Sequence, residues 1–142
     1  MEKIITRFGE VEYDPANLLH FPAGLIGLPN LRHFIVMPNK KSGPLFWIQS
    51  VDDPDMAFVL TDPTNFFLNY HVMPDAAERQ SLGMEENDDY FVLSIVSVPP
   101  DQSITLNLAA PILFAPKSNR AIQVILEKAD YSSKTPLPKV SD

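Results

Sequence analysis

Four carboxylates surround a short apolar run in the middle of the sequence. They are Asp52, Asp53 and Asp55 before the run at 57–60 (AFVL), and Asp62 after it. Clustered carboxylates can bind a metal ion, exchange protons with a substrate, or attract a basic protein. The spacing and the surrounding residues therefore have to distinguish a metal loop, an acidic active site and a protein-binding surface.

A calcium loop does not fit this spacing. An EF-hand loop needs Gly at its sixth position and Glu at its twelfth. A loop starting at Asp52 has Ala57 and Pro63 there, and one starting at Asp53 has Phe58 and Thr64. Asp-Asp-Pro-Asp is also a typical composition of a turn between strands. We therefore predict no metal site.

The other residue types that carry catalysis or bind cofactors are sparse. The chain has no cysteine, and His20, His33 and His71 do not have the spacing of metal ligands. It also lacks a Gly-rich phosphate loop and a G-x-S-x-G motif. We predict no enzymatic activity and no cofactor. One alternative stays open, a β-barrel enzyme or sugar-binding module with two carboxylates about 5–10 Å apart in a cleft.

The charge balance favours a basic partner. The 142 residues include 11 basic and 18 acidic side chains, giving a formal charge of -7. This field repels nucleic acid, and the densest basic pair along the chain is Lys40-Lys41. We therefore predict no direct nucleic-acid binding. The simpler interpretation, that the charge only keeps a small protein in solution, stays open.

Short alternating runs predict a β fold. In 104–110 the apolar residues fall on even positions, and 122–126 and 11–13 repeat this period of two. The run 91–98 (FVLSIVSV) is apolar on both faces, which is typical of a strand in the middle of a sheet or barrel. Further β-rich runs are 45–51 and 57–61.

One short helix is expected near 75–82. Asp75 can cap it, Glu78 completes a D-x-x-E capping box, and Gly83 can end it. Fourteen prolines argue against longer helices, and Pro111 marks an edge, a bulge or a strand break. The predicted fold class is all-β, mainly antiparallel: a small β-barrel-like single domain over 1–130 with a flexible tail over 131–142.

We identify no signal peptide and no membrane-spanning segment in the sequence. The start, MEKIITRFGEV, lacks the apolar core of a signal peptide, and no run of about 18 apolar residues exists. We therefore expect no membrane association and a cytoplasmic location.

Several segments together resemble one family. In order they are FGEVEY (8–13), HFPAGLIGL (20–28), FWIQSVDDPDMAFVLTDP (46–63), NLAAPILFAPKSNRAIQVILE (107–127) and DYSSKTPL (130–137). Each segment is weak alone, but the set, at compatible spacing over nearly the whole chain, resembles the flagellar assembly factor FliW family.

The resemblance implies a non-enzymatic protein of the bacterial cytoplasm with two protein partners. These are flagellin and the RNA-binding translational repressor carbon storage regulator A, which the factor antagonises beside its RNA site. Flagellin releases the repressor by occupying the factor. As contact candidates we take the four aspartates, with 85–89 (EENDD) as a second acidic segment and Phe21, Leu25 and Ile26 as apolar anchors.

Overall fold

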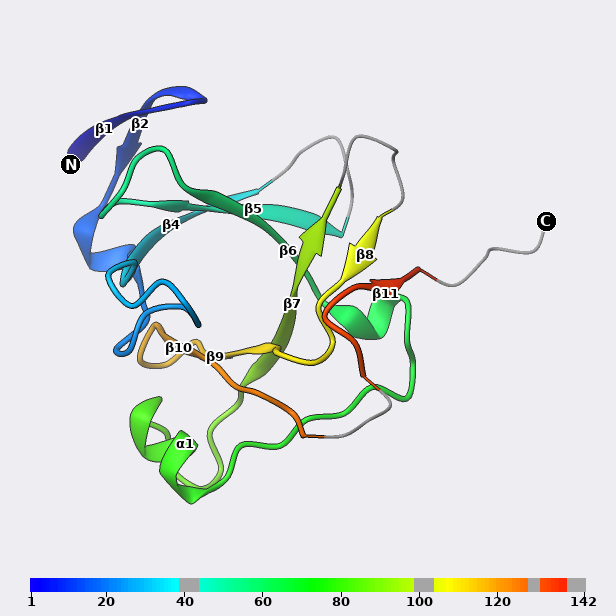
Figure 1. Ribbon diagram of the computed structural model, residues 1–142. Helices are drawn as coiled ribbons and strands as arrows, with labels where there is room; N and C mark the ends of the chain where they lie inside the picture. Colours follow the sequence, from blue (N-terminus) through cyan, green and yellow to red (C-terminus); the bar gives the residue numbers. More distant parts are fainter. Residues whose placement is uncertain (39–43, 99–103, 128–130, 138–142) are drawn as a thin grey trace.

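The structure is a computed structural model that describes residues 1–38, 44–98, 104–127 and 131–137. Short strands dominate it, with one α-helix and two 3-10 turns in the described part (Figure 1). The elements are β1 (Glu2–Thr6), β2 (Gly9–Tyr13), η1 (Pro15–Asn17), β3 (Leu19–His20), β4 (His33–Pro38), β5 (Leu45–Ser50), β6 (Ala57–Thr61), η2 (Pro63–Asn65), α1 (Ala76–Ser81), β7 (Phe91–Ser97), β8 (Thr105–Leu106), β9 (Ile112–Ala115), β10 (Arg120–Gln123) and β11 (Thr135–Pro136).

Seven strands close into a barrel. Neighbouring strands follow the order β7, β6, β5, β4, β3, β10, β9, and β9 pairs back onto β7. All these pairings are antiparallel except β3 with β10, which is parallel. Figure 1 looks into the ring. The predicted all-β, mainly antiparallel barrel with one short helix is confirmed.

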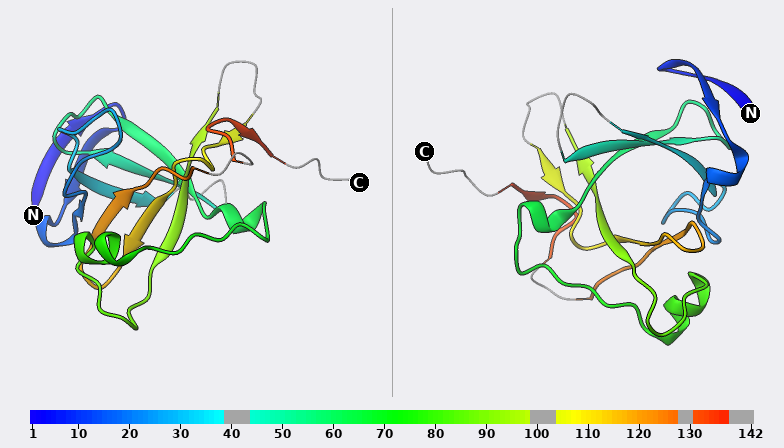
Figure 2. Two further views of the ribbon diagram at one scale, coloured as in Figure 1. Left: turned by 60° about the horizontal axis from the view of Figure 1, so that its bottom comes forward. Right: turned by 180° about the vertical axis from the view of Figure 1, so that it is seen from behind.

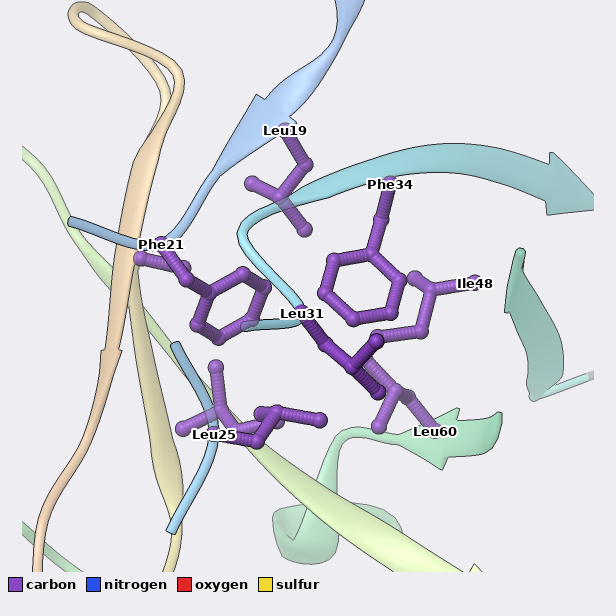
Figure 3. Packing of buried hydrophobic residues seen from close by; sticks show 9 residues of the cluster. Leu19, Phe21, Leu25, Leu31, Phe34, Ile48 and Leu60 are labelled. Atoms are coloured by element: carbon purple, nitrogen blue, oxygen red, sulfur yellow. The ribbon is translucent and has the colours of Figure 1, made fainter. Parts of the chain in front are cut away.

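The interior of the barrel is one apolar cluster, shown in Figure 3. Leu19, Phe34, Ile48 and Leu60 contribute to it from strands. The segment between β3 and β4 folds across one end of the ring, and its apolar side chains join the interior cluster. These side chains are Phe21, Leu25 and Leu31. One end of the barrel is therefore plugged by the chain itself.

A second apolar cluster lies on the outer face of β7, β9 and β10. Along β9 the side chains alternate, so that Ile112 packs inside the barrel and Leu113 packs in the outer cluster. The segments that cover this face are the long connection between β6 and β7 and the C-terminal segment (Figure 2). This explains why the run 91–98 is apolar on both faces, as a strand buried from two sides must be.

Pro111 marks a strand break between β8 and β9. Leu106 pairs with Val96 and Ile112 with Leu93, so the chain between β8 and β9 takes more residues than the facing part of β7. Proline cannot donate to the ladder, and the chain leaves β7 where Pro111 stands. The strand predicted over 104–110 is consequently reduced to Thr105–Leu106.

The predicted helix forms with both bonds of its capping box. The Asp75 carboxylate accepts from the Glu78 N–H at 2.8 Å, and the Glu78 carboxylate accepts from the Asp75 N–H at 2.8 Å. The helix ends before Gly83, which has a φ of 66°. Local sequence chemistry alone therefore determines this element.

Residues 131–137 of the predicted flexible tail over 131–142 contact the rest of the fold. In β11, Thr135 pairs with Leu106 of β8, and Tyr131 packs edge-on against Tyr70 with ring centroids 5.0 Å apart. Apolar side chains of this segment pack against the outer cluster and hold it in place. The segment has no periodic pattern of apolar residues, so its sequence did not indicate this attachment. Residues 138–142, like Lys40-Lys41, lie outside the described residues.

The β1–β2 hairpin lies against the outside of the barrel. Phe8 lies in the turn of this hairpin and packs edge-on against Trp47 of β5, with the ring centroids 5.1 Å apart. Within the described ranges, no helix has the length and apolar character needed to cross a membrane.

The outer cluster contains a polar bond that can be tested. The Tyr70 hydroxyl donates to the buried Leu108 carbonyl at 2.7 Å, and burial raises the pKa of Tyr70 far above its usual range. We expect Tyr70→Phe to lower the free energy of unfolding by about 1–2 kcal/mol, because a buried acceptor loses its donor. The control is Tyr131→Phe, at the edge-on neighbour of Tyr70, for which urea unfolding should show a free-energy change of less than about 0.5 kcal/mol. Equal losses in both variants would contradict this role of the bond.

Candidate protein-binding surface

The first three aspartates lie in the turn between β5 and β6, which a buried glutamine holds. The Gln49 side chain is fully buried and donates to the carbonyls of Ser50, Pro54 and Met56 at 2.9–3.1 Å. Its Oε1 has no hydrogen-bond partner among the described residues. Sequence analysis missed this residue, although an amide inside the apolar run 45–51 was a usable signal.

Asp52 is an acceptor for the backbone of the neighbouring strand. Its Oδ2 accepts from the N–H groups of Arg32 at 2.7 Å and His33 at 2.8 Å, and its Oδ1 lies 3.3 Å from the His33 ring. Partial burial raises the pKa of Asp52, but these hydrogen bonds outweigh it and hold the pKa below its ordinary value. The carboxylate therefore fixes the start of β4, and its Oδ2 is occupied by two backbone N–H groups.

Asp53 and Asp55 present their carboxylates to solvent. Asp53 accepts from the Asp55 N–H at 3.1 Å, which shapes the turn, and both residues are exposed. Arg7 from the β1–β2 turn donates to the Asp55 carbonyl at 2.9 Å. A cation therefore lies against the backbone of this turn and partly offsets its negative charge.

Asp62 is separate from the other three. It follows β6, whereas Asp52 to Asp55 precede that strand, so the length of β6 divides them. Its Oδ1 accepts from the N–H of Thr64 at 2.9 Å and from the Thr64 hydroxyl at 2.6 Å, and so it caps η2. The four predicted aspartates therefore do not form one patch.

The three apolar candidates differ in their exposure to solvent. Phe21 and Leu25 are 0% and 3% exposed and plug the barrel, so they cannot contact a partner in this conformation. This corrects their proposed role as anchors, because an apolar residue near a turn can equally close a barrel end. Ile26 is 47% exposed on the same loop and remains a candidate.

The opposite end of the barrel has an apolar pocket that sequence analysis missed. Its volume is about 230 Å³, and its lining is wholly apolar: Leu19, Val36, Phe46, Phe91, Leu93 and Phe114. Val36 and Phe91 are 47% and 52% exposed at its rim. The signal was the apolar run 34–37 (FIVM), which forms part of β4 but was not recognised as a strand.

The second acidic segment, 85–89, is an exposed loop as predicted from its composition. Asp88 is its best-anchored member, since it accepts from the Glu85 N–H at 2.9 Å and pairs with Lys117 at 3.4 Å. The hydrogen bond from the Glu85 backbone lowers the pKa of Asp88.

The two carboxylates on β2 do not have the burial that the sugar-cleaving alternative requires. Glu10 and Glu12 share one face of β2 beside Lys3, but Glu10 is 60% exposed and forms an ion pair with Lys3 at 3.6 Å. A glycosidase acid is tuned by burial in a cleft, which these side chains lack. In the described part of the chain, no group of three or more His, Cys, Asp or Glu side chains is placed to hold a metal ion.

Comparison with known proteins gives a consistent result. The model of the FliW protein family matches residues 3–137. The chain belongs to the FliW family. Flagellar assembly factor FliW 2 of Desulfotalea psychrophila is 68% identical over 140 residues, covering 99% of this chain and 93% of the relative. Flagellar assembly factor FliW of Syntrophotalea carbinolica is 66% identical over 135 residues, covering 95% of this chain and 96% of the relative.

The FliW fold is confirmed by a solved structure. The crystal structure of a flagellar assembly factor FliW superposes with a TM-score of 0.86 at 27% identity, covering 97% of this chain and 98% of the other. The family match ends at residue 137, just beyond β11. The attached C-terminal segment is thus included in what this chain shares with FliW proteins.

The role of Asp52 predicts a pH-dependent stability. We expect Asp52→Asn to lower the free energy of unfolding at pH 7 by about 1 kcal/mol, since charge-assisted bonds to two N–H groups are weakened. Because the folded pKa of Asp52 is lowered, its stabilisation is present above the unfolded pKa of about 3.9 and is lost as the pH falls through the folded value. Urea unfolding of both proteins should therefore converge in acid.

Asp55→Asn is the matched control, because no hydrogen bond to the Asp55 carboxylate is found in the described part of the chain. It should leave the unfolding free energy within about 0.5 kcal/mol at every pH. A stability difference for Asp52→Asn that is independent of pH would rule out the proposed bonds to the ionised carboxylate.

Proposed function

We propose that this protein is a non-enzymatic flagellar assembly factor of the bacterial cytoplasm that binds flagellin and antagonises the repressor carbon storage regulator A. The observation that carries the proposal is membership of the FliW family over residues 3–137. The formal charge of -7 supports it, since a negative protein is attracted to a partner that must carry positive surface to hold RNA phosphates.

The contact side chains in this proposal lie at the plugged end of the barrel. Asp53 and Asp55 are exposed there in the β5–β6 turn, and Ile26 lies on the loop that closes the same end. Exposed carboxylates and an exposed apolar residue at one end of the barrel suit a cationic surface with an apolar contact point. The acidic loop 85–89 is the second candidate.

Antagonism follows from charge once the two proteins are bound. A carboxylate-rich surface placed beside the RNA site of the repressor repels phosphates, and like charges in contact cost several kcal/mol. Since about 1.4 kcal/mol changes an affinity tenfold, RNA can be displaced without occlusion of its site. Flagellin that occupies the factor would free the repressor, which makes flagellin supply the controlling input.

Charge reversal tests the acidic turn. We expect the double variant Asp53→Lys and Asp55→Lys to weaken binding of the purified repressor at least about tenfold, because attraction becomes repulsion. Asp52 is left unchanged, since it supports β4. Isothermal titration at low and high salt measures the loss, and the salt dependence of the remaining binding should be shallower.

A matched variant separates a local effect from net charge. Glu2→Lys with Glu127→Lys makes the same change in charge at exposed positions on β1 and after β10. It should retain most of the affinity. If Glu85→Lys with Glu86→Lys abolishes binding and the turn variant does not, the contact surface is the second loop and the turn assignment is wrong.

The function itself is tested by capture from a lysate of a flagellated bacterium. The tagged protein should retain a small RNA-binding repressor, and added flagellin should release it. Retention of neither flagellin nor the repressor, or turnover of a carbohydrate by the purified protein, would reject the proposal.

A further inference from the structure

Basic side chains from distant parts of the sequence line up on the outside of the barrel. His20 of β3 pairs with His33 of β4 on one side and with Arg120 of β10 on the other. Paired residues project from the same face of a sheet. Their chain neighbours Phe34 and Ala121 are buried inside the barrel, so the three side chains point outward.

The rings of the two histidines are in contact. They stack with centroids 5.0 Å apart and an interplanar angle of 9°. Arg32 precedes His33, and its Nε donates to the Pro29 carbonyl at 3.1 Å, so its guanidinium lies against the loop before β4. Its charge still acts on His20. We call Arg120, His20, His33 and Arg32 the basic row. Both arginines are exposed, and neither forms an ion pair with a carboxylate in the described part of the chain.

The charges of the row also act on His20. The pKa of His20 is lowered by burial first, and then by the charges of His33, Arg120 and Arg32. Asp52 acts in the opposite direction, and it is the acidic group among those that shift this pKa. Its carboxylate is already held by the Arg32 and His33 N–H groups and lies 3.3 Å from the His33 ring. Asp52 thus compensates one end of the row and leaves the Arg120 end uncompensated.

We propose that the basic row is a docking site for an acidic segment of a partner protein, whose carboxylates bind Arg120 and Arg32 across the stacked histidines. This surface is distinct from the acidic turn in the proposed function. It has the opposite charge, and it takes a partner of opposite chemistry.

The spacing suits an extended peptide. Neighbouring strands lie about 4.8 Å apart, so the row extends roughly 10 Å from β10 to β4. In an extended segment, alternate side chains lie on one face and are separated by about 7 Å. Two glutamates with one residue between them can therefore reach the two arginines, each of which offers a planar fork of donors to a carboxylate.

Protein carboxylates fit this row better than nucleic acid. A polyphosphate chain carries its charge over a long length and would meet the field of a protein with net charge -7. A short acidic segment can place all its charges within the length of the row. The same net charge makes the interaction weak and sensitive to salt.

Acidic peptide binding tests the row directly. The probe is acetyl-Glu-Ala-Glu-Ala-Glu-amide, titrated into isotopically labelled full-length protein at low salt and followed by NMR. We expect saturable shifts at His20, His33, Arg32 and Arg120, and at least fivefold weaker binding in Arg32→Gln with Arg120→Gln. The Gln-Ala-Gln-Ala-Gln peptide should not bind.

Two controls make the result decisive. Lys3→Gln with Lys134→Gln removes the same charge from exposed positions elsewhere and should bind as the parent protein does. Thermal unfolding confirms that each variant is folded. Equal weakening in both double variants, shifts outside the row, or tighter binding of a short oligothymidylate than of the acidic peptide would each overturn the proposal.

A pH series supplies a readout that a structural role of these residues would not change. A bound carboxylate offsets the cations that disfavour charged His20, so binding raises the pKa of His20 and strengthens as the pH falls from about 8 to about 6. His20→Gln should reduce this pH dependence and leave the affinity at high pH unchanged. A parent protein with no pH dependence would contradict the role of the histidines. Repressor capture through the acidic turn does not depend on the row, so either inference can fail alone.

Discussion

Closure of the barrel requires β7 to use both of its edges. One edge pairs with β6, and the other pairs first with β8 and then with β9. Side chains from both faces of the strand pack in apolar clusters, Leu93 and Ile95 in the barrel interior and Val92 and Val96 in the outer cluster. The strand break before Ile112, the covering connection between β6 and β7, and the attached β11 all accompany a central strand that packs on two sides.

Local patterns in the sequence were sufficient for elements that depend on near neighbours. The helix followed from Asp75 and Glu78, and the central position of β7 followed from a run without polar alternation. The partners of β3 and β10 could not be predicted, because two strands of a few residues pair in parallel through a contact between positions far apart in the chain. Loop residues such as Leu25 and Ile26 were equally ambiguous, since adjacent apolar residues can have opposite exposure.

The surroundings of the charged residues also could not be predicted from local sequence patterns. The sequence contains an acidic run at 52–55, but the fold assigns Asp52 to the backbone of β4 and places Arg7 beside Asp55. Conversely, no run of basic residues exists near 33 or 120, yet β3 brings His33 and Arg120 to the same face. Residue types identified candidates, whereas their local field depended on tertiary contacts that no spacing rule encodes.

Asp52 connects the two charged surfaces at the plugged end of the barrel. It belongs to the acidic turn by sequence, but its oxygens hold the N–H groups of Arg32 and His33, which start the basic row. A partner that pulls the turn away from β4 must break these bonds, and a carboxylate placed on the row competes with Asp52 for the His33 ring. If one ligand changes the affinity for the other through this residue, the second must change the first by the same factor. One carboxylate would then be sufficient to couple a cationic partner to an anionic one without any movement of the barrel.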